Sequence, residues 1–248
     1  MFKHRGKRRT YAHNLKLASI LSSVAGIVNI TGVLEFKILT TNVTGHFAYF
    51  SEELVFGYFK KAYVFLFYIL FFLLGAFVSG FFIELMSRAY KESRLSYVLP
   101  VSVEIGVMCA LVISSHIFIQ YDSLYHVPFT LALLFTMGLQ NALVTKVSGS
   151  VVRTTHLTGL FTDLGIELSQ LLFSKETAEK KQLHRGISLK LAIILCFFGG
   201  GVIGGVSYSF FKLNTLLIPI LLLLFSLWYD GLLFRFYHLK RKFRDHRL

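Results

Sequence analysis

Two short stretches of this sequence are copies of each other. Residues 41–47 are Thr-Asn-Val-Thr-Gly-His-Phe, and residues 155–161 are Thr-His-Leu-Thr-Gly-Leu-Phe. Five residues after each stretch comes the same pair, Glu53-Leu54 in the first half of the chain and Glu167-Leu168 in the second. The pattern T-x-x-T-G-x-F followed by E-L therefore occurs twice, which indicates an internal repeat.

Other features recur in the same order around these two stretches. In the first half they are the pair Gly26 and Asn29, the pair Gly75 and Gly80, and Pro100. Their counterparts in the second half are Gly138 and Asn141, Gly200 and Gly205, and Pro219. The alternative is chance similarity between membrane segments that contain glycine and threonine. Because both order and spacing persist, we interpret the chain as two copies of one unit, repeat 1 over about 15–120 and repeat 2 over about 127–234.

The composition is that of an integral membrane protein. Of the 248 residues, 54% are hydrophobic and 16% are charged, with a mean hydropathy of +0.62. These values are too apolar for an ordinary soluble domain of this size. The net charge of +13 could suggest nucleic acid as a partner, but Lys and Arg gather at the termini and in alternate connections, as they do in membrane proteins. We therefore expect no nucleic-acid partner.

The apolar runs predict about six membrane-spanning helices. A helix needs roughly 20 apolar residues to cross a bilayer, and such runs lie at 15–34, 62–86, 98–119, 127–145, 189–211 and 216–234. Two further apolar segments, at 45–58 and 159–173, are too short to cross as helices. The predicted fold class is an all-α membrane protein with about six transmembrane helices, two short re-entrant or interfacial helices and a 3+3 inverted-topology internal repeat.

Basic residues set the expected orientation. A basic arm at 1–14 precedes the single membrane domain at 15–234, and a basic tail at 235–248 follows it. The second and fourth connections are also basic, whereas the third, at 120–126, has no Lys or Arg. We therefore expect the chain in the cytoplasmic membrane with both termini in the cytoplasm. Since each repeat has three spans, the two repeats should lie in opposite orientations about a pseudo-two-fold axis.

The duplicated Thr-Gly motif is the candidate site. The hydroxyls of Thr44 and Thr158 could cap the short helices that follow, while Gly45 and Gly159 allow close backbone approach. Two helix starts brought together near the midplane would present free N–H groups to a small anion or polar solute. The alternative is that Thr and Gly only let helices pack closely, and that Asn29 and Asn141 hydrogen-bond across helices rather than orient a solute in a central cavity. The expected solute-binding residues are Asn29, Thr41, Thr44, Gly45, Gln140, Asn141, Thr155, Thr158 and Gly159.

Charged residues in apolar surroundings are candidates for coupling, because ionisable groups at membrane depth cost free energy and tend to mark pathways. Glu104 is the deepest; it is either a buried proton-binding carboxylate or an interfacial group near the cytoplasmic edge. Glu53 and Glu167 are equivalent in the two repeats and could be paired coupling sites, or else capping or solvent-exposed groups. The remaining candidates are Asp163 on the second short segment and Arg153, which either attracts an anion or only follows the positive-inside rule.

Metal and nucleotide chemistry find no motif here. The nine His are scattered without H-E-x-x-H, and the cysteines, Cys109 and Cys196, both lie in apolar runs. There is no G-x-x-x-x-G-K-[ST] for ATP. We expect no metal, no cofactor and no enzyme activity.

Some of these residues also resemble a known family. Thr44-Gly45, Gly138-Leu139-Gln140-Asn141, the run from Arg153 to Gly159, and Thr162-Asp163-Leu164-Gly165 are similar to those of the YoaK family, also called DUF1275, of small bacterial multi-pass membrane proteins. The family often has an Asp at the place of Asn29 and an Asn at the place of His46. The resemblance covers nearly the full length and implies a bacterial membrane protein of about six spans, but no activity.

The expected function is a secondary transporter or channel for a small polar or anionic solute. The alternative is a non-transport membrane assembly or regulatory protein. A wet polar cavity at the Thr-Gly motifs favours the first, and tight packing there favours the second. The expected partners are the lipid bilayer and a small solute, and the sequence leaves open a homodimer.

Overall fold

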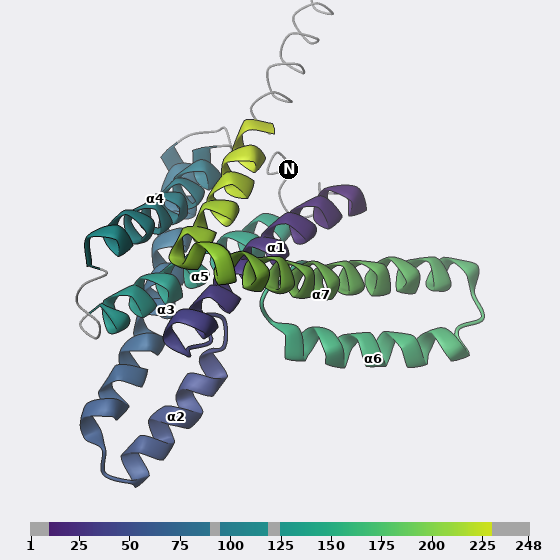
Figure 1. Cartoon of the computed structure of the whole chain (residues 1–248). Coiled ribbons are helices and arrows are strands. Elements are labelled where there is room, and N and C mark those ends of the chain that lie inside the picture. The colour runs from purple at the N-terminus through teal and green to yellow at the C-terminus, as the bar shows by residue number, and fades with distance from the viewer. Residues whose placement is uncertain (1–9, 90–94, 119–124, 230–248) are drawn as a thin grey trace, which may run out of the picture.

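The structure is a computed structural model, and it describes residues 10–89, 95–118 and 125–229. This described part is helical and contains no strand. Its helices are α1 (Tyr11–Phe36), α2 (Val43–Val55), α3 (Phe59–Ala89), α4 (Leu95–Phe118), α5 (His126–Ser148), α6 (Leu157–Phe173), α7 (Thr177–Phe211) and the 3-10 helix η2 (Lys212–Leu216), after which the chain is helical over 217–229 (Figure 1). Most of the basic N-terminal arm, all of the tail and residues 230–234 of the last predicted span lie outside these ranges.

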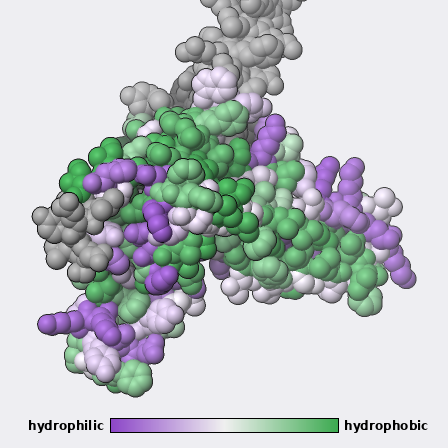
Figure 2. All heavy atoms as spheres, viewed as in Figure 1, coloured by the Kyte–Doolittle hydropathy of each residue, from purple (hydrophilic) through white to green (hydrophobic). Residues whose placement is uncertain are grey.

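Five helical stretches of the described chain are long and apolar enough to cross a membrane. They are Tyr11–Phe36, Phe59–Ala89, Tyr97–Ile117, His126–Ser148 and Thr177–Tyr229. Large apolar side chains such as Phe77, Phe198 and Trp228 are more than half exposed on them, as expected for surfaces that face lipid. In Figure 2 apolar side chains cover much of the visible helix surface, and hydrophilic ones gather at the far ends of the α2–α3 and α6–α7 hairpins. The all-helical, multi-span prediction is confirmed at this level.

The last stretch contains a break that bears on the number of spans. It has 53 residues, which as one straight helix would extend about 80 Å, more than twice the hydrocarbon thickness of a bilayer. Lys212 has a φ of 50° at the end of α7, and the chain changes direction at η2 (Figure 1). Pro219 lies in the first turn of the helix that follows, where its missing N–H costs no helical hydrogen bond. Two predicted spans, 189–211 and 216–234, fall on either side of this break.

The short segments between the predicted spans are helices, as expected. α2 packs along α3 and α6 packs along α7, so each short helix forms a hairpin with the long helix that follows it (Figure 1). The longest packing surfaces join α1 to α7 and α3 to α5, helices far apart in the sequence.

Glycines make both of these long surfaces close. A Cβ added at Gly26 of α1 would overlap the backbone carbonyl oxygen of Phe197 on α7. A Cβ added at Gly138 of α5 would overlap the carbonyl oxygen of Phe72 on α3. Small residues let helix backbones approach each other in this way inside membranes.

The reverse contacts come from the partner helices. Gly200 of α7 leaves no room for a Cβ against the carbonyl oxygen of Ser23, and Gly75 of α3 leaves none against that of Phe135. Gly26 and Gly138 start the first motif of each repeat, and Gly75 and Gly200 belong to the second recurring pair. Each of the two surfaces therefore has one close glycine contact from each of its helices: Gly26 and Gly200 between α1 and α7, and Gly138 and Gly75 between α5 and α3.

Candidate functional site

The two Thr-Gly motifs begin where a long helix ends. Lys37 closes α1 with a φ of 59°, and Gly149 closes α5 with a φ of 65°, both in the left-handed region that ends helices. The predicted capping by Thr44 and Thr158 is wrong, because the N-cap residues are Asn42 and His156. The Asn42 side chain accepts a hydrogen bond of 3.0 Å from the Gly45 N–H. Both helices start two residues earlier than the motif suggested, so the two threonines lie exposed in the first turns.

The two short helices do not form one joint site. α2 contacts α3, α6 contacts α7, and the described parts of α2 and α6 make no contact with each other. Figure 1 shows the two hairpins extending in different directions. The expectation that both helix starts meet around one anion is therefore wrong, since each short helix follows its own long helix instead.

Asparagine and threonine tie each motif back onto the preceding helix. Asn29 of α1 accepts hydrogen bonds from the Thr41 hydroxyl at 3.0 Å and from the Thr41 N–H at 3.3 Å. In the other half, Asn141 of α5 accepts one from the Thr155 hydroxyl at 2.6 Å. The same pair of residue types thus makes the same bond after α1 and after α5, and none of these four residues lines either of the two cavities described below.

Gln140 also has a structural partner. Its side chain is fully buried, and its Nε2 donates a hydrogen bond of 2.8 Å to the carbonyl oxygen of Leu21. This bond joins α5 to α1 at the centre of the bundle. Of the residues expected to bind solute, Asn29, Thr41, Gln140, Asn141 and Thr155 therefore hold helices and loops together.

We expect Thr155→Val to lower the free energy of unfolding by about 1 kcal/mol, because it removes the hydroxyl that Asn141 accepts from while keeping the shape. Thr158→Val is the matched control three residues away, since that side chain is exposed on α6. It should change stability by less than about 0.5 kcal/mol. Thermal unfolding of the purified protein in detergent measures both. Equal effects of the two substitutions would contradict the role of the Asn141 bond.

A cavity of about 610 Å³ lies beside the second motif. It is an open cavity lined by α6, the first half of α7, the start of α1 and the loop that follows α5, and we call it the α6 cavity. It contains four residues singled out in the sequence, Arg153, Gly159, Asp163 and Glu167. Residues that sequence reasoning did not select for the site complete its polar lining, among them Tyr11, Asn14, His156, Gln182, Arg185 and Lys190.

An ion pair organises one wall of the α6 cavity. The Lys190 ammonium of α7 lies 2.7 Å from Oε1 of Glu167 on α6, and both side chains are mostly buried. Gly186, one turn before Lys190, makes room for the carboxylate, because a Cβ there would lie 2.8 Å from both Glu167 oxygens. With this pair mutually neutralised, Arg153 and Arg185 face a single remaining carboxylate, Asp163. Counting Lys, Arg, Asp and Glu alone, the cavity lining therefore carries an excess of one positive charge.

The corresponding region of the first repeat is aromatic. Counting from the shared Glu53/Glu167 and Gly75/Gly200 positions, Asp163 corresponds to Tyr49, and Lys190 corresponds to Phe65. The Tyr49 and Phe65 rings stack at 5.2 Å, and the buried His46 ring packs 5.5 Å from Tyr68. Burial lowers the pKa of His46, so this imidazole is neutral near pH 7. The repeat thus carries charged groups in one copy and packed rings in the other.

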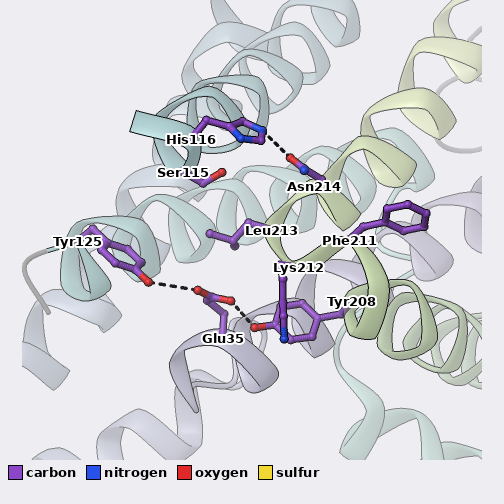
Figure 3. Close-up of a pocket in the computed structure, with 9 residues that line it drawn as sticks. All are labelled: Glu35, Ser115, His116, Tyr125, Tyr208, Phe211, Lys212, Leu213 and Asn214. Carbon is purple, nitrogen blue, oxygen red and sulfur yellow. Dashed lines mark hydrogen bonds between the residues drawn. The ribbon is translucent and has the colours of Figure 1, made fainter. Parts of the chain in front are cut away.

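A second cavity, of about 320 Å³, was not expected from the sequence. We call it the Glu35 pocket; it lies where α1 and α4 end, α5 begins and α7 meets η2 (Figure 3). The Glu35 carboxylate accepts hydrogen bonds from the hydroxyls of Tyr125, at 3.4 Å, and Tyr208. Across the pocket, His116 Nε2 lies 2.9 Å from the Asn214 side-chain oxygen. The only feature of the sequence that could have indicated this pocket is Glu35, a carboxylate directly after the apolar run 15–34.

Glu104 is buried among the helices that pack around α4. Its side chain is 0% exposed, and neither carboxylate oxygen has a hydrogen-bond partner in the described part of the protein. This burial fits the interpretation as a buried carboxylate, and the depth of Glu104 in the membrane stays a prediction. The other candidate carboxylate, Glu53 on α2, is half-buried, with Oε2 unpartnered among the described residues.

These features define an all-helical, multi-span membrane protein with one polar cavity beside a duplicated Thr-Gly motif. The chain belongs to the DUF1275 family, described as a protein of unknown function, whose pattern it matches over residues 17–229. The match includes both motifs, the Glu35 pocket and all of the α6 cavity lining except Tyr11 and Asn14, and it confirms the resemblance noted in the sequence. No curated protein and no solved structure matches the chain.

Proposed function

We propose that this protein is a secondary transporter or channel for a small anionic or polar solute, and that the α6 cavity is its solute site. The observation that carries the proposal is a polar cavity of about 610 Å³ with an excess of cationic side chains, within a chain of long apolar helices. Ligand cavities commonly have volumes of about 300–1,000 Å³. A cavity of this kind at the motif favours transport over a purely structural membrane role.

The proposal includes a 3+3 inverted repeat in the bilayer. It is supported by the exchange of partners between the two halves: α1 of the first packs on α7 of the second, and α5 of the second packs on α3 of the first. The Asn29–Thr41 and Asn141–Thr155 bonds supply a second equivalence. The closely packed pairs α1–α7 and α3–α5 each combine helices of both halves, and we infer that these two pairs would be the bodies that move against each other.

The solute class follows from the charges around the α6 cavity. Arg153 and Arg185 offer planar donors that match a carboxylate or phosphate, the anions that arginine binds in two-pronged fashion. Asp163 and the Glu167–Lys190 pair add groups that can accept from or donate to a polar solute. We infer a small carboxylate or phosphate-type anion. No residue of the cavity is assigned a catalytic role.

Uptake into proteoliposomes tests this proposal. The probes are radiolabelled succinate, glutamate, phosphate and sulfate, each compared with empty vesicles. For the transported probe, Arg153→Gln and Arg185→Gln should each reduce uptake at low solute concentration by about tenfold or more, because a hydrogen bond to a charged group contributes about 1.5–3 kcal/mol. Lys181→Gln is the control, since this exposed cation lies on α7 but does not line the cavity.

Two outcomes would overturn the proposal. One is the absence of flux above empty vesicles for every probe, which favours the alternative, a membrane assembly or regulatory protein. The other is equal flux in Arg153→Gln, Arg185→Gln and the control Lys181→Gln. This result would show that the α6 cavity is not part of the transport pathway.

A further inference from the structure

Glu104 is a buried carboxylate that the solute site does not use. It lies in α4, seven residues after the start and thirteen before the end of the apolar stretch Tyr97–Ile117. At 1.5 Å per residue, it is about 10 Å from one end of this stretch and about 20 Å from the other. Its side chain is 0% exposed, and both oxygens are without a hydrogen-bond partner in the described chain.

No described charge compensates this carboxylate. α4 packs against α3, α5 and η2, and every Lys, Arg, Asp and Glu on those three elements is exposed: Lys60, Lys61, Glu84 and Arg88 on α3, Lys146 on α5 and Lys212 on η2. The helix over 217–229 carries no charged residue. The remaining titratable groups are Tyr63 and Tyr68 on α3, Tyr97, Cys109 and His116 on α4, His126 at the start of α5 and Tyr229.

A buried anion without a partner is very costly, whereas a buried neutral carboxylic acid is much less so. A proton from water therefore resides on one oxygen of Glu104 in this conformation. Since a charge at this depth becomes tolerable only when water or a cation reaches it, release of the proton requires a conformation in which α4 is hydrated. The position is therefore suited to alternate between a protonated, sealed state and an ionised, open state.

The same face of α4 leads to the Glu35 pocket. Ser115 lies eleven residues after Glu104, three helical turns and about 16 Å further along, and it lines that pocket together with His116 (Figure 3). Met108 and Leu111 occupy the two turns between them and are 0% and 7% exposed. Two apolar side chains thus separate the buried carboxylate from a cavity with polar walls.

We propose that Glu104 is the proton site of a proton-coupled transport cycle, loaded from the Glu35 pocket when Met108 and Leu111 move apart. This inference rests on the proposed transport function and names its coupling ion. One proton bound at Glu104 neutralises one charge, so that a monovalent anion and a proton cross together without net charge transfer. The proposed coupling ion is H⁺, because a proton needs only one oxygen of this carboxylate, whereas a metal cation needs several oxygen ligands.

Infrared spectroscopy tests the proton site without requiring transport. In the reconstituted full-length protein at pH 7 we expect the carbonyl stretching band of a protonated carboxyl group, lost in Glu104→Gln. Glu52→Gln, which alters an exposed carboxylate on α2, should leave that band unchanged. Glu104→Met is a second variant in case the glutamine disturbs folding, which size-exclusion chromatography in detergent reports. A band that persists in both folded Glu104 variants would overturn the assignment.

Flux measurements test coupling. With the probe that the wild-type protein transports, a pH difference of one unit across the vesicle membrane should drive up to about tenfold accumulation. Glu104→Gln should retain solute exchange without a pH difference and lose this accumulation. If wild-type flux does not depend on the pH difference, proton coupling is overturned, but the proposed transport function is not. No wild-type flux, with the infrared band present, overturns transport and its coupling but leaves the buried proton site.

Discussion

Gly200→Ala is expected to lower the free energy of unfolding by about 3 kcal/mol, whereas Gly199→Ala, one residue earlier, should raise it by up to about 1 kcal/mol. The added methyl group at Gly200 would overlap the backbone of Ser23 on α1, and a backbone cannot rotate away as a side chain can. At Gly199 nothing lies within 4 Å of the new Cβ, so only the gain in helix propensity remains. The two substitutions are chemically identical and should differ in sign.

Thermal unfolding in detergent, followed by intrinsic fluorescence, measures this difference. The other long surface offers an independent copy of the experiment, with Gly75→Ala facing the backbone of Phe135 and Gly80→Ala facing open space. We expect Gly75→Ala to destabilise as strongly as Gly200→Ala. A fall in stability at Gly199 equal to that at Gly200 would show that the α1–α7 approach does not depend on the missing side chain.

Glycine and asparagine positions made the helix pairing partly readable in the sequence. Gly26, Asn29, Gly75 and their counterparts recur in order because each is required at a contact that the fold makes twice. Apolar runs of about 20 residues located the long helices for the same kind of reason, since span length follows from bilayer thickness.

Only part of the α6 cavity could be predicted from the sequence. Arg153, Asp163 and Glu167 stood out because they lie in or beside a motif. Arg185 on the next helix resembled an ordinary topology-determining cation, and Lys190, inside the predicted span 189–211, was not selected. Pairing across two helices depends on the turn between them, which no local pattern specifies. The expectation that the starts of α2 and α6 lie together was wrong for a related reason. Two copies of a sequence motif need not contact each other in the fold.

The Glu35 pocket left almost no sequence signal. Its carboxylate, Glu35, lies on α1. Its tyrosines are Tyr125, just before α5, and Tyr208 on α7, and its other polar groups lie on α4 and η2. These residues fall in three parts of the chain, at 35, 115–125 and 208–214, and the pocket has no counterpart in the duplicated motifs. Only the tertiary packing of helix ends brings them together, so the pocket could not be derived from spacing or composition.

Breaking the Glu167–Lys190 ion pair is expected to have the second largest effect on stability. The side chains are 24% and 15% exposed, and Glu167→Gln would leave the Lys190 ammonium mostly buried opposite a neutral amide. We expect a loss of about 2 kcal/mol, below the 3–5 kcal/mol typical of fully buried pairs because both groups keep some contact with solvent. Adding Lys190→Met should recover part of this loss, because the uncompensated charge is then removed.

The chain contains its own control for this argument. Glu84 and Arg88 form an ion pair of 3.2 Å on α3, but these side chains are 52% and 80% exposed. Glu84→Gln should therefore cost less than about 0.5 kcal/mol, since exposed pairs are screened by water and salt. A double-mutant cycle on each pair, read from thermal unfolding in detergent, gives the two coupling energies. Similar values for both pairs would contradict the view that burial in the α6 cavity wall makes Glu167 and Lys190 depend on each other.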